Sequence, residues 1–484
     1  MVTGDVAEPS GARTAAARRR PWAAVVGLPA GALYLALDWV RFSTGRSGNY
    51  DLGIFAQAAQ SWAGGDWPRS AIRGLDTLFA DHFSPITILF GLGWLVWPDP
   101  RSLLVVQSLA LGLTVVLVGA AAGRQLPSRV AVPVTLAAAV AKGVVSAASF
   151  DVHETALGAP VMAGLAWGLL ERRRRVVVGC SAALLLVKED LGLTVLMAAG
   201  VWWWLVQDRR TALGLAGLGL AGFVIANVVV VVAAPDHRNP YLQFLAGASG
   251  NPQGLTGAEV HGGTRWAPAL LFLLAAGVVG LRSPLAVLAV PTLGWRAASS
   301  NVSYWQTYFH YDAVLVPVAA FALIDVVARL RRPGGATATR AAAGVPTGVV
   351  AGVVAGSLAW SAAIGSAKVA AWQPWHPQRY VPTSRMRDAA ALGGLVPRGG
   401  PVVAQQDLGP AVLARVDVRM LSDTVAVRGR WVLLSSDGGQ LGAPQAAKAR
   451  WLAAELARPD VRVVRRGDCL LVGLPGEENV LLRG

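Results

Sequence analysis

Long runs of apolar residues, interrupted by short clusters of charge, fill most of the chain. A helix that crosses a bilayer needs about 20 mostly apolar residues, with a range of roughly 17 to 25. The runs that reach or approach this length are residues 21–40, 102–122, 130–149, 155–170, 176–187, 191–206, 212–234, 266–281, 284–298, 313–330 and 345–364. The pattern predicts an α-helical polytopic membrane protein with about eleven transmembrane helices.

One further apolar run, residues 85–97, is too short to span a bilayer and ends in Trp-Pro-Asp-Pro. We expect it to form a helix that lies at the membrane interface, with Trp94 and Trp97 near the lipid headgroups. The charge pattern agrees, because every strongly basic loop falls on one side of the membrane only if this segment does not cross.

Basic residues gather between the apolar runs and set the expected orientation. The clusters are residues 18–20, 172–175, 209–210 and 329–332. The positive-inside rule assigns such loops to the cytoplasm. It predicts a multi-pass protein of the cell membrane with a disordered cytoplasmic tail (1–20) and an extracytoplasmic C-terminus. Charged residues make up 15% of the chain, against about 25% in soluble proteins. The net charge of +15 forms no basic stripe interleaved with aromatics, so nucleic acid is not an expected partner.

The last part of the chain has a different pattern. Residues 370–484 contain short apolar runs separated by helical stretches such as 443–457, which predicts a small extracytoplasmic α/β domain. Residues 21–369 form the predicted transmembrane domain. Its first outer loop, 41–101, carries the interfacial helices.

Titratable residues collect at the predicted outer ends of the helices. Ionisable groups at membrane depth are costly and usually face a cavity or a partner. Those that need an explanation are Asp51, Asp81, His82, Asp151, His153, Glu154, Lys188, Glu189, Asp190, His310, Tyr311 and Asp312. Walker loops, dinucleotide fingerprints, zinc-protease motifs and nucleophile elbows do not occur in the sequence.

Two of these groups lie in the first outer loop. Asp51 either accepts a proton from an acceptor hydroxyl or caps a helix, since Asp is a preferred N-cap residue. Ser84 before Pro85 is a good helix start. His82 either binds phosphate or supports Asp51 in a proton relay, and it also fits an ordinary surface histidine.

The other groups follow at later helix ends. Asp151 and Glu154 share a helix face, and with His153 they form either a metal site or a support for a phosphate-bound cation. The run Lys188-Glu189-Asp190 fits a site that neutralises a lipid phosphate, or a self-neutralising turn.

The aromatic run at residues 304–312 fits a sugar or lipid headgroup, because aromatic rings stack on apolar sugar faces. It also fits an ordinary aromatic belt, which explains Tyr311 but leaves His310 unexplained.

As a set, these motifs resemble a bacterial membrane family known as domain of unknown function 2079. They are Tyr-Asp-Leu-Gly-Ile-Phe (50–55), His-Phe-Ser-Pro (82–85), Phe-Asp-Val-His (150–153), Lys-Glu-Asp (188–190) and Phe-His-Tyr (309–311), joined by 403–415 and 431–434. The resemblance runs from about Asp38 to the C-terminus, and only the combination is specific. Val152 and Asp312 differ from the residues usual at these positions in the family, but the pattern of carboxylates and histidines in the motifs is kept.

That family looks like the GT-C superfamily of membrane glycosyltransferases, which includes protein mannosyltransferases and aminoarabinose transferases. The resemblance implies a GT-C-like fold and a polyprenyl-phosphate-linked sugar donor reached from the outer leaflet. It also implies an essential acidic residue in the first outer loop, here Asp51. The interfacial helices that follow it match residues 49–62 and 85–97. Many GT-C enzymes need no metal, so a divalent cation is left open.

Our first hypothesis is therefore an inverting glycosyltransferase whose partners are the lipid-linked donor and membrane lipid. Its catalytic residue is Asp51. The predicted substrate-binding residues are His82, Lys188, Glu189, His310 and Tyr311, and the candidate metal ligands are Asp151 and His153. Two alternatives stay open: a transporter or flippase of a lipid-linked saccharide, and a non-catalytic envelope protein.

Overall fold

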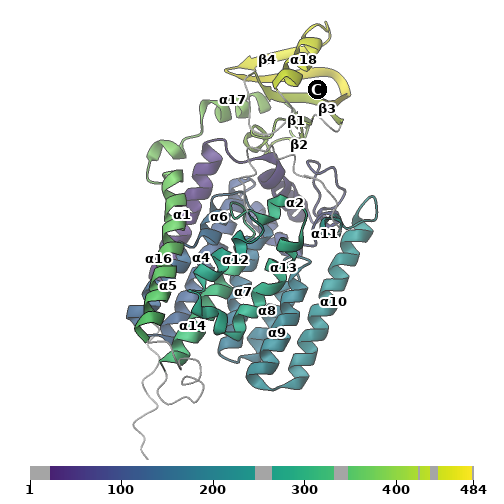
Figure 1. Ribbon diagram of the computed structural model, residues 1–484. Helices are drawn as coiled ribbons and strands as arrows, with labels where there is room; N and C mark the ends of the chain where they lie inside the picture. Colours follow the sequence, from purple (N-terminus) through teal and green to yellow (C-terminus); the bar gives the residue numbers. More distant parts are fainter. Residues whose placement is uncertain (1–21, 246–263, 332–346, 423–425, 437–444, 482–484) are drawn as a thin grey trace, which may run out of the picture.

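The structure is a computed structural model that describes residues 22–245, 264–331, 347–422, 426–436 and 445–481. It consists of a bundle of helices with a small sheet domain at one end (Figure 1). The predicted tail, residues 1–20, lies outside the described residues.

Each predicted apolar segment coincides with helical structure. The corresponding elements are α1 (Trp22–Ser43), α4 (Arg101–Gln125), α5 (Ser128–Ala139) with α6 (Lys142–Ala148), α7 (Glu154–Leu170), α8 (Arg174–Leu184), α9 (Leu191–Val206), α10 (Arg209–Ala233), α12 (Ala267–Ala275) with η4 (Val279–Arg282), η5 (Pro284–Ala289) with α13 (Val290–Ala298), α14 (Leu315–Leu330) and α16 (Thr347–Trp372). Four described helices are long and apolar enough to cross a membrane, or five if the bent pair α5–α6 is one span. The prediction of an α-helical polytopic membrane protein is confirmed, while the count of eleven spans stays a prediction.

The first loop carries short helices at the sheet end of the bundle. They are η1 (Asn49–Gly53), α2 (Ile54–Ala63), η2 (Leu78–Ala80), η3 (Pro85–Thr87) and α3 (Ile88–Val96). Large apolar side chains of α3 are exposed, notably Leu92, Leu95 and Val96. An exposed apolar face on a short helix is what a membrane-interface helix needs, so this segment has the expected character.

Glycines let neighbouring helices approach closely. A Cβ atom on Gly112 of α4 would lie 3.0 Å from the Cα atom of Gly31 in α1, and one on Gly192 of α9 would lie 2.7 Å from the carbonyl oxygen of Gly219 in α10. Small residues at helix contacts are how membrane helices gain packing energy, because lipid offers no hydrophobic driving force between them.

The C-terminal region forms a mixed five-stranded sheet with two helices. Its elements are α17 (Ser384–Gly393), β1 (Pro401–Ala404), β2 (Asp417–Met420), β3 (Val427–Ser435), α18 (Gln445–Leu456), β4 (Arg462–Arg466) and β5 (Cys469–Val480), joined to the bundle through η7 (Pro377–Tyr380). The strand order is β2-β1-β3-β5-β4. Strand β1 is parallel to β2 and β3, while β5 is antiparallel to β3 and β4. The predicted small α/β domain is confirmed.

The sheet domain packs directly on the first loop (Figure 1). Leu52 and Phe55 from this loop share one hydrophobic cluster with Val402, Leu408 and Leu433 of the sheet domain. The turn after β1 also hydrogen-bonds to η1, since the Gln406 carbonyl accepts from the Asn49 amide at 2.9 Å and Gln406 Oε1 accepts from the Tyr50 amide at 3.1 Å. The loop that carries Asp51 is thus built from two distant parts of the chain.

Candidate functional site

Asp51 lies inside a π-helical turn, η1, rather than at a helix start. The N-cap position of η1 is Gly48 and that of α2 is Gly53, and neither helix has a side-chain capping bond. The capping alternative for Asp51 is therefore wrong. Single π-helical turns occur frequently at functional sites because they displace side chains from the regular helical register.

A chain of alternating charges runs inward from Asp51. His153 Nε2 lies 3.3 Å from Asp51 Oδ1, and His153 Nδ1 lies 3.5 Å from Glu154 Oε2. Glu154 Oε1 then lies 3.4 Å from Lys188 Nζ. The exposed side-chain fractions fall along this chain, from 18% at Asp51 to 12% at His153 and 1% at Glu154. Three loops of the chain thus meet in one partly open site.

His310 packs against this chain as a neutral group. Its ring stacks on His153 with centroids 3.3 Å apart, and its Nδ1 lies 3.2 Å from Thr155 Oγ1. Burial, reinforced by the positive charge of His153, holds the pKa of His310 well below its ordinary value. His310 therefore supports His153 through the stacked ring alone, while its hydrogen bond with Thr155 fixes its own position.

His153 is the titratable group of the site with the clearest functional consequence. Burial opposes its charged form, but the carboxylates of Asp51 and Glu154 outweigh burial and raise the pKa of His153 to about 9. At neutral pH His153 is an imidazolium between two carboxylates. In this form neither ring nitrogen of His153 can accept a further proton.

The raised pKa of His153 predicts that stability falls at alkaline pH. An unfolded histidine titrates near about 6.5, so the stabilisation is fully present below that pH and is lost as pH rises through about 9. We expect the unfolding free energy in detergent to fall across this window by on the order of 1 kcal/mol per pH unit. The measurement is the thermal unfolding midpoint against pH. His153→Gln should flatten the fall and His376→Gln, at an exposed site, should not; an equally steep fall in His153→Gln would contradict this account.

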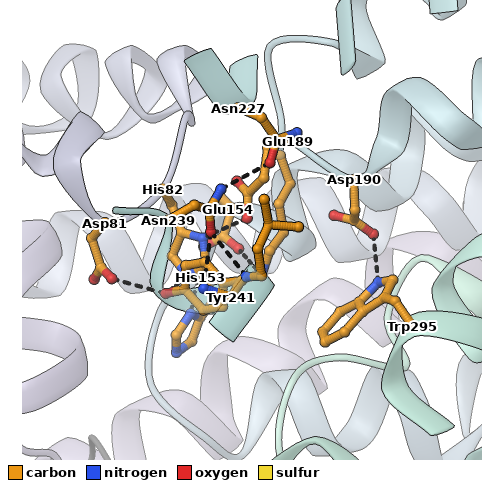
Figure 2. A network of polar contacts seen from close by, with 12 residues as sticks. Asp81, His82, His153, Glu154, Glu189, Asp190, Asn227, Asn239, Tyr241 and Trp295 are labelled. Atoms are coloured by element: carbon orange, nitrogen blue, oxygen red, sulfur yellow. Dashed lines mark hydrogen bonds and ion pairs between the residues drawn. The ribbon is translucent and has the colours of Figure 1, made fainter. Parts of the chain in front are cut away.

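A second polar network lies beside the first (Figure 2). His82 Nδ1 lies 3.0 Å from Glu189 Oε1, and its Nε2 lies 2.6 Å from the Tyr241 hydroxyl. Tyr241, from the short helix α11 (Pro240–Leu245), also donates to Asp81 Oδ1 at 2.8 Å. Arg73 forms a two-pronged pair with Asp81, both contacts at 3.0 Å. His82 is thus fixed between a carboxylate and a phenol.

Lys188 is the buried cation of the site. Its Nζ lies 5.8 Å from the ring centre of Tyr311 and 6.0 Å from that of Trp295. Burial alone would favour the neutral amine, but Glu154 and Glu189 outweigh it and raise the pKa of Lys188. Lys188 therefore stays charged.

Two carboxylate oxygens near Lys188 accept no hydrogen bond. They are Glu189 Oε2 and Asp190 Oδ1, which are buried and have no hydrogen-bond donor among the residues that the structure describes. The other oxygen of Asp190 accepts from the Trp295 indole at 2.8 Å (Figure 2). Buried acceptors normally find a partner, so this cluster suits a ligand with several hydroxyl groups.

Asp151 turns away from this cluster. Its Oδ1 accepts from Arg41 Nε at 3.0 Å, and its Oδ2 accepts from the Gly48 amide at 3.0 Å. Within the described parts of the chain, no group of three or more His, Cys, Asp or Glu has an arrangement that could hold a metal ion. The metal-ligand prediction for Asp151 and His153 stays a prediction, and the contacts of Asp151 instead give it the role of fixing the start of η1.

Sequence reasoning missed several residues of the site. Arg296 donates to Asp312 Oδ1 at 2.6 Å and to the carbonyls of Tyr304 and Gln306, which fixes η6 (Val302–Trp305) and the turn before His310. Arg296 lies at a predicted outer helix end, where the positive-inside rule does not expect an arginine. This exception could have marked Arg296 as a residue of the site. Arg73, Tyr241 and Trp295 lie in segments whose sequence carries no such signal.

The fold and the site together define a multi-pass membrane protein with a small sheet domain at one end of its helix bundle. The chain belongs to the family of predicted membrane proteins DUF2079, whose model matches residues 46–451. Among solved structures, ArnT from Cupriavidus metallidurans bound to undecaprenyl phosphate is similar at 15% identity and a TM-score of 0.55, covering 96% of this chain and 99% of that one. ArnT in the apo state has the same identity and TM-score and covers 93% and 97%. No curated protein sequence matches this chain.

Proposed function

We propose that this protein transfers a sugar from a polyprenyl-phosphate donor to an acceptor hydroxyl. The observation that supports this most strongly is the charge chain Asp51–His153–Glu154–Lys188. It ends beside Glu189 Oε2 and Asp190 Oδ1, two buried oxygens that accept no hydrogen bond from the described residues. It lies at the end of the bundle that holds the interfacial helices, where a lipid-linked substrate would arrive. The similar ArnT structure, described as bound to undecaprenyl phosphate, supports this class of lipid partner.

Asp51 is the proposed general base. The acceptor oxygen attacks the anomeric carbon, the bond from that carbon to the phosphate oxygen breaks, and the hydroxyl proton passes to Asp51. Because His153 is already protonated, it cannot take this proton. It would instead keep the Asp51 carboxylate oriented through the contact at 3.3 Å.

The remaining groups are proposed to hold the donor. Lys188 and His82 would offset the charge that develops on the departing lipid phosphate. Glu189 would accept hydrogen bonds from sugar hydroxyls, and the Tyr311 ring would lie along the sugar. His310 would maintain the position of His153 through the stack described above.

We also propose that the sheet end of the bundle faces outward. The basic loops at residues 172–175 and 209–210 lie at the other end of the helices (Figure 1), as the positive-inside rule expects of a cytoplasmic face. The N-terminus would then be cytoplasmic and the sheet domain extracytoplasmic.

Sugar transfer by the purified protein tests this function. The protein in lipid nanodiscs is mixed with a panel of labelled polyprenyl-phosphate sugars and an extract of envelope acceptors. We expect label to move from one donor to an acceptor and the free polyprenyl phosphate to accumulate in equal amount. A folded protein that gives no transfer with any donor would contradict the proposal and would favour transport of the lipid-linked saccharide.

A further inference from the structure

The ends of α4, α7, α9 and α14 and the start of η5 surround a cavity of about 310 Å³. These helix ends lie on the side of the bundle opposite the sheet domain (Figure 1). Pockets that bind small ligands in proteins usually measure about 300 to 1,000 Å³. Arg172 and Trp204 line the cavity and are exposed, so it reaches the protein surface. It is separate from the Asp51 site, none of whose residues lines it.

Two carboxylates line this cavity, and each is already paired with an arginine. Glu171 Oε2 lies 2.6 Å from Arg173 Nε, and Asp325 Oδ2 lies 2.7 Å from Arg329 Nη2. The Ser283 hydroxyl also donates to Asp325 Oδ2 at 2.5 Å. Both carboxylates are therefore neutralised within the protein, and the cavity does not call for a cation.

Arg172 is the lining cation that forms no ion pair with the described residues. It follows the last turn of α7 with a φ of +55°, a left-handed conformation that glycine usually takes at the end of a helix. A side chain other than glycine costs energy in this conformation. The guanidinium of Arg172 is thus placed at the cavity without a partner from the described chain.

The surroundings of the cavity are strongly basic. Apart from the lining residues, the described part of this end holds arginines at positions 124, 129, 173–175, 209, 210, 282 and 331. It holds one further carboxylate, Asp208, which caps α10 by accepting from the Thr211 amide at 3.2 Å. A guanidinium keeps its positive charge in proteins, so this surplus persists even where the side chain is partly buried. The cavity therefore suits an anion.

We propose that this cavity binds the phosphate headgroup of an anionic glycerophospholipid from the adjacent membrane leaflet. Arg172 would donate charge-assisted hydrogen bonds to the phosphate oxygens. Trp204, which is 73% exposed at the end of α9, would lie among the headgroups, where tryptophan is enriched. Its exposed ring at the cavity favours a lipid over a soluble anion, and basic pockets between membrane helices are known to hold such headgroups.

This site goes beyond sugar transfer, and its occupant is a lipid of the bulk membrane. Because the cavity joins the ends of α4, α7, α9 and α14, a bound headgroup would hold these four helix ends together. A ligand that binds the folded state alone stabilises it. We therefore expect the lipid to raise the thermal unfolding midpoint of the protein.

Titration of phosphatidylglycerol onto the purified protein in neutral detergent, followed by native mass spectrometry, tests this site. Arg172→Gln should raise the dissociation constant of the first bound lipid about tenfold, and Arg172→Lys about threefold. The matched control is Arg210→Gln, because Arg210 is exposed at the same end of the bundle but does not line the cavity. It should leave the dissociation constant unchanged. Unchanged binding in Arg172→Gln, or equal weakening in both glutamine variants, would overturn the proposal.

Two other ligands separate the headgroup charge from the lipid. Phosphatidylcholine, whose choline cation offsets the phosphate, should bind at least about tenfold more weakly than phosphatidylglycerol. Free glycerol phosphate, which has no acyl chains, should not displace bound phosphatidylglycerol at equal concentration. Equal binding of phosphatidylcholine would overturn the anion selectivity, and displacement by glycerol phosphate would overturn the lipid as the source of the phosphate.

Thermal unfolding with and without phosphatidylglycerol gives a second readout. The midpoint should rise in the native protein and in Arg210→Gln, and rise less in Arg172→Gln. An equal rise in all three proteins would contradict the site. These assays contain no sugar, so they stay informative if sugar transfer fails, and a protein that transfers sugar can still refute this inference.

Discussion

Replacing Asp51 with asparagine is expected to lower sugar transfer by about 10²- to 10⁴-fold, the usual contribution of a general base. The amide keeps the size of the carboxylate and its place in η1 but cannot take the acceptor proton. The measurement is the single-turnover transfer rate in nanodiscs, with the donor identified from the panel above. Because Asp51 is partly exposed at the site, the substitution should leave the fold intact.

The matched control for this variant is Asp66→Asn. Asp66 belongs to the same loop, is exposed and pairs only with the exposed Arg69 at 3.2 Å within the described residues. It should retain the native rate. Full activity in Asp51→Asn would show that Asp51 is not the general base. Equal losses in both variants would indicate that substitutions in this loop lower activity by destabilising it.

Replacing Gln406 with alanine is expected to lower kcat by about tenfold or more with little change in KM. Its side chain accepts a hydrogen bond from the half-buried Tyr50 amide next to Asp51, and a hydrogen bond of this kind contributes about 1 kcal/mol. Its loss would shift η1 away from its present geometry and so displace Asp51, while the lysine and histidine groups proposed to hold the donor stay in place. Steady-state kinetics separate the two parameters.

Gln378→Ala is the control for the Gln406 variant. Gln378 is exposed and also lies C-terminal to the helix bundle, in η7. It should leave both parameters unchanged. A Gln406 variant that changes KM alone, or that keeps native kinetics, would show that the sheet domain does not position Asp51.

The helical segments were predictable because a helix that crosses a bilayer needs a run of about 20 mostly apolar residues, which the sequence displays directly. The predicted run 191–206 coincides with α9, and the short run 85–97 is found as η3 and α3. The run 266–281 is interrupted instead, at Gly277 and Val278, which both have positive φ. A positive φ is unusual for a valine, and a hydropathy pattern does not record backbone angles.

From the sequence, the site could be predicted only as separate charged residues at the ends of helices. Asp51, His153 and Lys188 were each located from charges at helix ends, and their assembly follows because those ends meet on one side of the bundle. The partners of Asp151 were not foreseen, because Arg41 lies within an apolar helix and is 110 residues away. Gln406 was missed for a similar reason, since its contact with Tyr50 joins residues 356 positions apart and follows no periodic pattern.

The same separation between Tyr50 and Gln406 has a consequence for synthesis of the protein. A ribosome that adds about 5 to 20 residues per second needs roughly 20 to 70 s to cover the 356 positions between them. During that interval the acidic loop has been made but its support has not. A nascent chain, or one terminated before Gln406, would thus contain the helix bundle without this support for the loop that carries Asp51.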